Sequence, residues 1–172
     1  MNQPLDESFT SYYDKEDFKK SSDVSSRLAL HQIYLAHSEL KMFNSIRKIA
    51  GTEMALQASI ESGFAHEEKS EFISSVLKLI LKGILDSDSQ ELPKGTEVIE
   101  IQCTFALEGQ LLRPYESTEE KIEHLKCFST IGAALAMWPF LREFIFSQSA
   151  RTGLNALVLP YIKVHAREMP KS

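Results

Sequence analysis

The sequence is poor in the residue patterns that most directly indicate secretion, metal binding or membrane insertion. It has two cysteines, Cys103 and Cys127, too few for a disulfide framework and without zinc-ligand spacing. Two reduced thiols fit a cytoplasmic protein. The N-terminal residues lack the charged and apolar regions of a secretory signal. The longest apolar stretch, Ile131 to Leu141, is too short to span a bilayer, so no membrane insertion is expected.

A catalytic constellation is also missing. The five histidines show no metal-ligand spacing, and the seven glycines form no phosphate-binding loop. No serine lies in a nucleophile-elbow motif, and Cys103 falls on the apolar face of a predicted strand, where a buried, unreactive thiol is expected. We therefore predict a protein that is not an enzyme, with no catalytic residue, no metal ligand and no cofactor.

What is present is an ordinary globular composition with an acidic balance. The 172 residues are 43% hydrophobic and 25% charged, enough for one domain with a hydrophobic core. The net charge of −5 argues against nucleic acid as a partner, because phosphate binding needs a basic surface. Residues 1–26 are polar and charged, which predicts a flexible N-terminal arm, and residues 27–172 are expected to form the single domain.

Four segments are predicted to be strands. The clearest is residues 99–108, where Ile99, Ile101 and Cys103 begin a strict alternation with polar residues. The others are residues 28–42, which also fit a helix in part, residues 54–60 and residues 72–84. Turn chemistry is expected at Ser62-Gly63 and between residues 86 and 95. Short connections and one-sided strands favour an antiparallel sheet.

A long helical region is predicted from about Thr118 to Thr152, with a break near residues 127–130. Ser117 with Glu120 has the form of a capping box at its start, and Gly153 suits a C-cap. Strands followed by a helix predict an α+β fold, in which a four-stranded antiparallel sheet carries the long C-terminal helix on one face.

The segment 138–143, Trp-Pro-Phe-Leu-Arg-Glu, combines a proline and two charges with large apolar residues. Apolar side chains occur at nearly every angle around this helix, whereas packing on one sheet requires a single apolar stripe. Another subunit is the simplest cover for the remaining apolar side chains. The expected oligomer-interface residues are Trp138, Phe140, Leu141, Arg142 and Glu143.

A second apolar run follows between Leu154 and Val164, interrupted by Pro160. It is interpreted either as core that covers the sheet or as the wall of an apolar groove between helix and sheet that takes extended hydrophobic segments.

At Phe128 to Ile162 the sequence resembles the SecB-like chaperone family. The resemblance is carried by the aromatic-Pro-aromatic-x-Arg-Glu motif at 138–143, by Arg151-x-Gly153 and by the run Leu157-Val158-Leu159-Pro160. It implies an ATP-independent chaperone, or holdase, that assembles as a dimer or a dimer of dimers. Its partners would be unfolded or nascent polypeptides, including an antitoxin. By position, the peptide-binding groove would contain Tyr34, Phe43, Phe105, Phe144, Leu157, Leu159 and Tyr161.

The sequence also departs from the protein-export members of that family. Its last residues are basic, with neither a full second helix nor the acidic tail that helps to dock the translocation motor SecA, and its N-terminal arm is long. These features look more like the toxin–antitoxin-associated SecB-like chaperones, and the choice between export and antitoxin control stays open. An alternative is a non-catalytic oligomeric adaptor whose groove is closed by its own N-terminal arm, through Tyr12, Tyr13 and Phe18.

Overall fold

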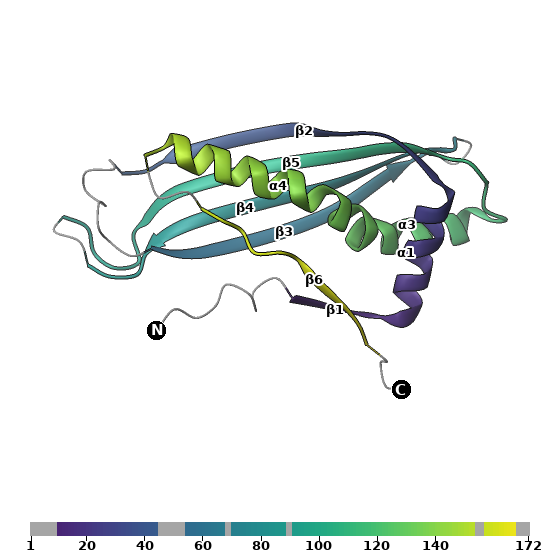
Figure 1. The fold of residues 1–172 in the computed structure, drawn as a ribbon, viewed down its shortest axis with the longest axis horizontal. Coiled ribbons are helices and arrows are strands. Elements are labelled where there is room, and N and C mark those ends of the chain that lie inside the picture. Colours follow the sequence, from purple (N-terminus) through teal and green to yellow (C-terminus); the bar gives the residue numbers. More distant parts are fainter. Residues whose placement is uncertain (1–9, 45–53, 68–69, 89–90, 154–156, 168–172) are drawn as a thin grey trace.

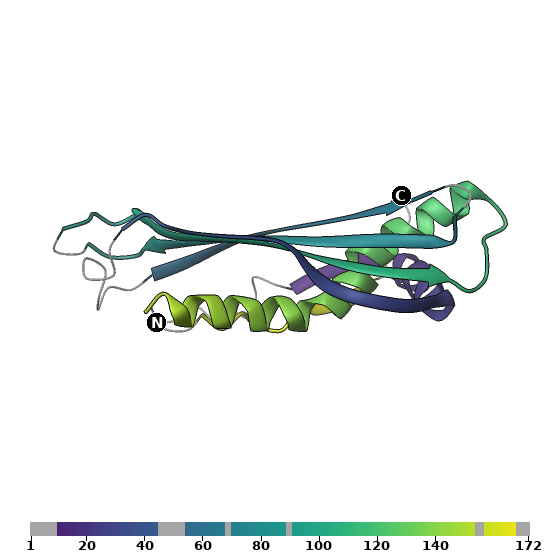
Figure 2. The same ribbon diagram turned by 90° about the horizontal axis from the view of Figure 1, so that it is seen from above.

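The computed structural model describes residues 10–44, 54–67, 70–88, 91–153 and 157–167. A four-stranded sheet forms one layer, and helices with a small two-stranded sheet lie on one side of it (Figures 1 and 2). In chain order the elements are β1 (Thr10–Asp14), α1 (Lys15–Arg27), β2 (Leu28–Met42), β3 (Met54–His66), β4 (Phe72–Leu85), β5 (Glu97–Leu111), α3 (Thr118–Thr130), α4 (Gly132–Arg151) and β6 (Lys163–Arg167).

The four predicted strands form one antiparallel sheet in the order β2-β5-β4-β3, which confirms the predicted fold class. Along β4 every second residue from Ile73 to Leu85 is buried, and the residues between them are half-buried. The turn expected at Ser62-Gly63 is wrong, because both residues lie inside β3 opposite Leu77 and Val76. As an edge strand with one neighbour, β3 tolerates a small Ser-Gly pair that would weaken a central strand.

The helical region divides at Ile131, close to the predicted break. Ser117 caps α3, since its hydroxyl accepts a hydrogen bond from the Glu120 amide at 3.1 Å. Gly153 has φ 79°, the left-handed conformation expected of the residue that follows a helix C-terminus. The continuous helix α4 then runs along the four-stranded sheet (Figure 2).

Of the flexible arm expected at residues 1–26, residues 1–9 lie outside the described residues, whereas residues 15–26 are helical together with Arg27. They form α1, which packs against α3 and buries Val24 and Ser21. The Ser21 hydroxyl accepts a hydrogen bond from the Gly132 amide at 3.1 Å, and Lys20 forms an ion pair with Glu123 at 2.6 Å. The small pair Ser21 and Gly132 allows α1 to approach the start of α4 closely.

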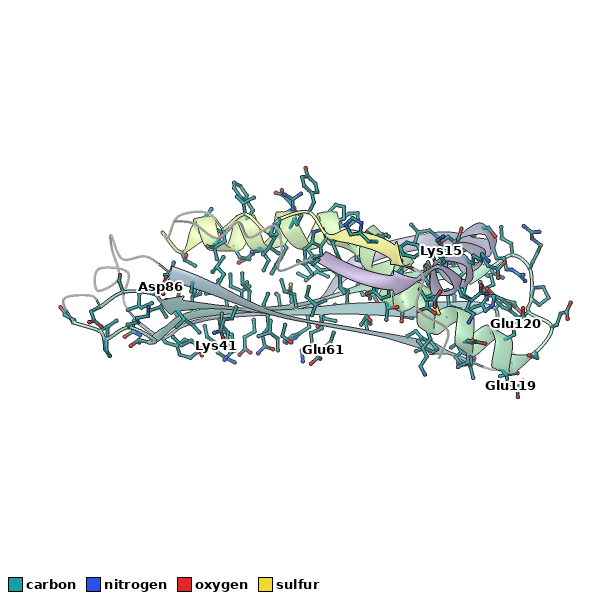
Figure 3. The ribbon with its side chains drawn as sticks, turned by 90° about the horizontal axis from the view of Figure 1, so that it is seen from below. Lys15, Lys41, Glu61, Asp86, Glu119 and Glu120 are labelled. Carbon is teal, nitrogen blue, oxygen red and sulfur yellow. The ribbon has the colours of Figure 1, made fainter. Side chains whose placement is uncertain are left out.

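The sheet face opposite α4 carries polar side chains. Figure 3 shows Lys41 and Glu61 projecting from this face. Near the start of β5, Glu100 accepts a hydrogen bond from Gln102 at 3.0 Å and forms ion pairs with Lys41 and Lys82, both at 3.2 Å. The hydrogen bond from Gln102 and those from Lys82 and Lys41 lower the pKa of Glu100 to about 2. This face is therefore suited to water, and the apolar core lies on the other.

Candidate polypeptide-binding surface

Helix α4 has one face in the core and one face on the surface. Met137, Trp138 and Leu141 lie toward the sheet and are almost fully buried. The outward side exposes large apolar groups, with Phe140 at 49% and Phe146 at 44%. The apolar character on all sides of this helix thus leaves uncovered apolar surface in a single chain.

The five residues expected at an oligomer interface are divided by this arrangement. Phe140 and Glu143 are exposed and Arg142 is half-buried, so these three are available on the surface. Trp138 and Leu141 are already covered by their own chain at 2% and 0% exposure. These two side chains pack between α4 and the sheet, so they cannot contact another subunit directly.

The segment 157–162 lies beside α4 and is attached to it through main-chain atoms. The Trp138 indole N–H donates to the Pro160 carbonyl at 3.0 Å, and Arg142 Nε donates to the Leu159 carbonyl at 2.7 Å. Further along the helix, the Ser149 hydroxyl accepts a bond from the Leu157 amide at 2.8 Å. Because the segment has no regular secondary structure, its main-chain groups need such partners. The helix therefore fixes the course of the segment.

A hollow of about 460 Å³ lies between this segment and the outward side of α4. Its walls are Pro139, Arg142, Glu143, Phe146, Val158, Leu159 and Tyr161. The Arg142 guanidinium lies 3.9 Å from the centre of the Tyr161 ring, while 71% of Tyr161 remains exposed. Val158 is 59% exposed. The hollow combines apolar walls with one charge of each sign, a composition that suits binding of a polypeptide segment.

A second apolar area lies on the other flank of α4, next to β2. The rings of Phe105 and Phe144 meet edge to face with centroids 6.1 Å apart. Beside them, Leu35 and Leu40 pair in register with Phe105 and Ile101 and are 40% and 36% exposed. The helix covers the central strands better than the edge strand, which leaves Leu35 and Leu40 accessible while Phe105 is buried at 6% exposure.

The seven predicted groove residues therefore do not form one site. Leu157, Leu159 and Tyr161 lie on the segment beside α4, and Phe105 with Phe144 lies on the opposite flank. Tyr34 is on the sheet face away from α4, where its hydroxyl donates to Glu108 at 2.8 Å. Phe43 follows the end of β2, and its amide bonds to the Val98 carbonyl. The sheet therefore separates Tyr34 from the others, and Phe43 lies just past the end of β2 with half of its surface exposed.

Sequence reasoning missed several exposed members of these surfaces, namely Leu35, Leu40, Phe146 and Val158. Phe146 had a usable signal, since it follows Arg142 by one helical turn. The β2 residues had none, because register irregularities lie between Leu30 and Gln32 and between Leu35 and His37. Each irregularity interrupts the alternation that would assign side chains to faces.

Within the described ranges, no three His, Cys, Asp or Glu side chains come together as a metal-binding group. No helix in that part of the chain is long and apolar enough to cross a membrane.

Comparison with known proteins gives a structural likeness only. No protein-family model and no curated protein matches the sequence. The chain is similar to the SecB-like chaperone Rv1957 of Mycobacterium tuberculosis, solved in complex with a ChAD peptide from the HigA1 antitoxin. The TM-score is 0.70 at 12% identity, over 84% of this chain and 98% of that chain. A protein of unknown function from Streptococcus agalactiae has a TM-score of 0.36 at 8% identity, over 78% and 97% of the two chains.

At 12% identity, the similarity to the mycobacterial chaperone concerns the fold alone. The likeness agrees with the resemblance found in the sequence motifs at 138–160. The four-stranded antiparallel sheet with its long helix therefore has the fold of the SecB-like chaperones.

Proposed function

We propose that this protein is an ATP-independent chaperone that holds unfolded polypeptide segments. The observation that carries the proposal is the SecB-like fold with apolar side chains exposed along both flanks of α4. Exposed apolar surface of this kind is uncommon on a monomeric soluble protein unless it binds something. Binding without chemistry also agrees with the lack of catalytic motifs in the sequence.

The clients are extended segments rich in apolar and aromatic residues. The hollow beside Tyr161 and Val158 accepts such side chains, and Arg142 and Glu143 at its wall offer partners for polar groups. The similar mycobacterial chaperone was solved with an antitoxin peptide, which makes an antitoxin one candidate client here. A role in cytoplasmic protein export is the other candidate and would use the same surface.

Self-association belongs to this proposal. The outward side of α4 at Leu135 and Phe140, which are exposed and do not line the hollow, is the surface expected to meet a second copy. A dimer or a dimer of dimers formed there would bring the hollows of two chains close together. One extended client could then contact more than one chain and gain affinity by multivalency.

The test is suppression of aggregation by the purified full chain, followed by light scattering of chemically denatured citrate synthase. We expect suppression at a near-stoichiometric ratio. The double variant Val158→Asp/Tyr161→Asp places two charges in the hollow and should lose most of the effect. The matched control is Gln57→Asp/Ser59→Asp, which adds the same charge on the exposed, α4-free face of β3 and should behave like the wild type.

Absence of suppression at any ratio by the wild type would rule out the proposal. Equal loss of activity in both double variants would show that added charge, rather than the hollow, decides the result.

The adaptor closed by its own N-terminal arm is a second candidate, favoured by one observation. Strand β1 pairs with β6, which directly continues the segment that walls the hollow. Tyr13 and Phe18 themselves lie elsewhere. Their rings meet edge to face, and the Tyr13 hydroxyl donates to the Thr130 carbonyl at the end of α3. Main-chain pairing is therefore the contact through which the arm reaches this region.

A further inference from the structure

The two-stranded sheet joins the two ends of the described chain. Thr10–Asp14 runs parallel to Lys163–Arg167 in a five-residue register from Thr10 opposite Lys163 to Asp14 opposite Arg167. The pair is separate from the four-stranded sheet and lies on the same side of it as α4 (Figures 1 and 3). Parallel strands normally occur inside larger, covered sheets, and an isolated pair of strands is marginally stable in water.

The adjoining helix is held very differently. Val24 of α1 is completely buried, and Asp23 bonds to His124 of α3 at 2.9 Å. Arg27 bonds to Asp23 at 3.0 Å and to the Pro114 carbonyl at 3.0 Å. These contacts come from several positions along α1, so the helix is anchored along its length. Strand β1, in contrast, is attached mainly through its pairing with β6.

The boundary between the anchored helix and the strand is sharp. Asp14 ends β1 and also caps α1, since its carboxylate accepts a hydrogen bond from the Glu16 amide at 3.0 Å. Its backbone is extended, with φ −63° and ψ 148°. Rotation at this one residue would move β1 while α1 stays in place. Among the described residues, Tyr13 makes one side-chain contact with the end of α3. Its hydroxyl donates a long hydrogen bond of 3.4 Å to the Thr130 carbonyl.

The strand to which β1 pairs is continuous with the candidate client surface. Tyr161, in the wall of the hollow, precedes β6 by two positions, and Leu159 two positions earlier is bonded to Arg142. A client segment that enters the hollow and continues along the chain would reach the edge of β6. That edge offers the main-chain groups with which an extended segment pairs by strand addition.

We propose that β1 is a displaceable strap that occupies the β6 edge in the resting protein and competes with extended client segments for it. This inference rests on the proposed chaperone function for the identity of the competitor. A client can bind the β6 edge only while the strap is unpaired, so the apparent affinity for clients is proportional to the fraction of time that the strap is unpaired. A strap closed for about nine-tenths of the time weakens binding roughly tenfold.

The test uses the full chain with Ser11→Pro/Tyr12→Pro. Two adjacent prolines remove consecutive amide donors from the strap, whichever face of β1 supplies them. Ser11→Ala/Tyr12→Ala is the matched control, because it changes the same side chains and keeps the donors. The probe is reduced, carboxymethylated α-lactalbumin, a permanently unfolded chain, and its dissociation constant is measured by fluorescence anisotropy. We expect about tenfold tighter binding by the proline variant and an unchanged constant for the alanine variant.

Hydrogen exchange provides a readout that needs no client. In the wild type, the amides of residues 163–167 should exchange much faster than those of β4 and α1, and in the proline variant faster still. Protection of β6 equal to that of β4, or no change in the proline variant, overturns the strap. Equal probe binding by all three proteins overturns its regulatory role. If no protein binds the probe, the proposed function fails, and the exchange result alone decides whether the strap opens.

Discussion

The two faces of the four-stranded sheet are built from alternate residues of the same strands. One face carries apolar side chains that are buried under α4, and the other carries polar and charged side chains. On β4, Leu79 faces α4 and is fully buried, whereas its neighbour Ile80 is only half-buried on the bare face. The covered face depends on packing against α4 and on the segment fixed to it. The bare face depends on charge pairs such as those of Glu100. One face can therefore serve as scaffold and binding layer while the other stays in water.

The largest expected effect is on the covered face at Trp138. Replacement by Ala removes a buried indole and its bond to the Pro160 carbonyl, which should lower the free energy of unfolding by about 3–5 kcal/mol. Trp138→Phe keeps most of the packing and loses the bond, so its loss should be clearly smaller. Urea denaturation of both variants measures the difference. Losses below 1 kcal/mol for Trp138→Ala would show that α4 is held mainly by other contacts.

A direct comparison of the faces comes next in size. Leu79→Ala should reduce stability by about 2–5 kcal/mol, because it leaves a cavity beneath the helix. Ile80→Ala, one residue away on the bare face, should cost roughly 1 kcal/mol. Both substitutions shorten an aliphatic side chain by the same number of carbon atoms in the same strand. Equal losses, measured by urea denaturation, would indicate that the bare face is also covered in solution.

The smallest effect concerns pH and Glu100. Its pKa lies near 2 in the folded protein, below the ordinary value of 4.5, so the unfolded chain binds a proton first as the pH falls. Its stabilising contribution is complete above the unfolded pKa and is lost as the pH falls toward 2. The melting temperatures of the wild type and Glu100→Gln should therefore converge between neutral pH and acid. A constant separation across that range would mean that the charge of Glu100 is not responsible.

Much of the fold follows from local sequence patterns, and the exceptions have physical causes. The alternation from Ile99 to Leu107 predicted β5, and Ser117 with Glu120 predicted the start of α3. Helix α1 was missed because its packing uses small Ser21 and a single large buried residue, Val24. The pairing of β1 with β6 joins residues more than a hundred positions apart, and no local pattern reports such a contact.

The candidate surface was predicted less completely than the fold. Leu159 and Tyr161 were found from the motif region and do line the hollow. Tyr34 was assigned to the same groove, although it lies on the opposite sheet face. Its position depends on the irregularities in β2, which change the facing of residues without any mark in the hydrophobic pattern. The exposure of Phe146 and Val158 depends on the packing of segment 157–162 against α4, which the local sequence pattern does not report.

The attachment of segment 157–162 has a consequence for which substitutions the segment tolerates. Trp138 and Arg142 hold the segment through the carbonyl oxygens of Pro160 and Leu159, groups that every amino acid supplies. The exposed side chains of Val158 and Tyr161 take no part in those two bonds. Substitutions at position 158 therefore alter the wall of the hollow without touching either bond, whereas a substitution at position 161 also removes the ring over which the Arg142 guanidinium lies. The side-chain wall of the hollow at position 158 and the attachment of the segment are thus provided by different atoms, a side chain in the first case and main-chain carbonyls in the second.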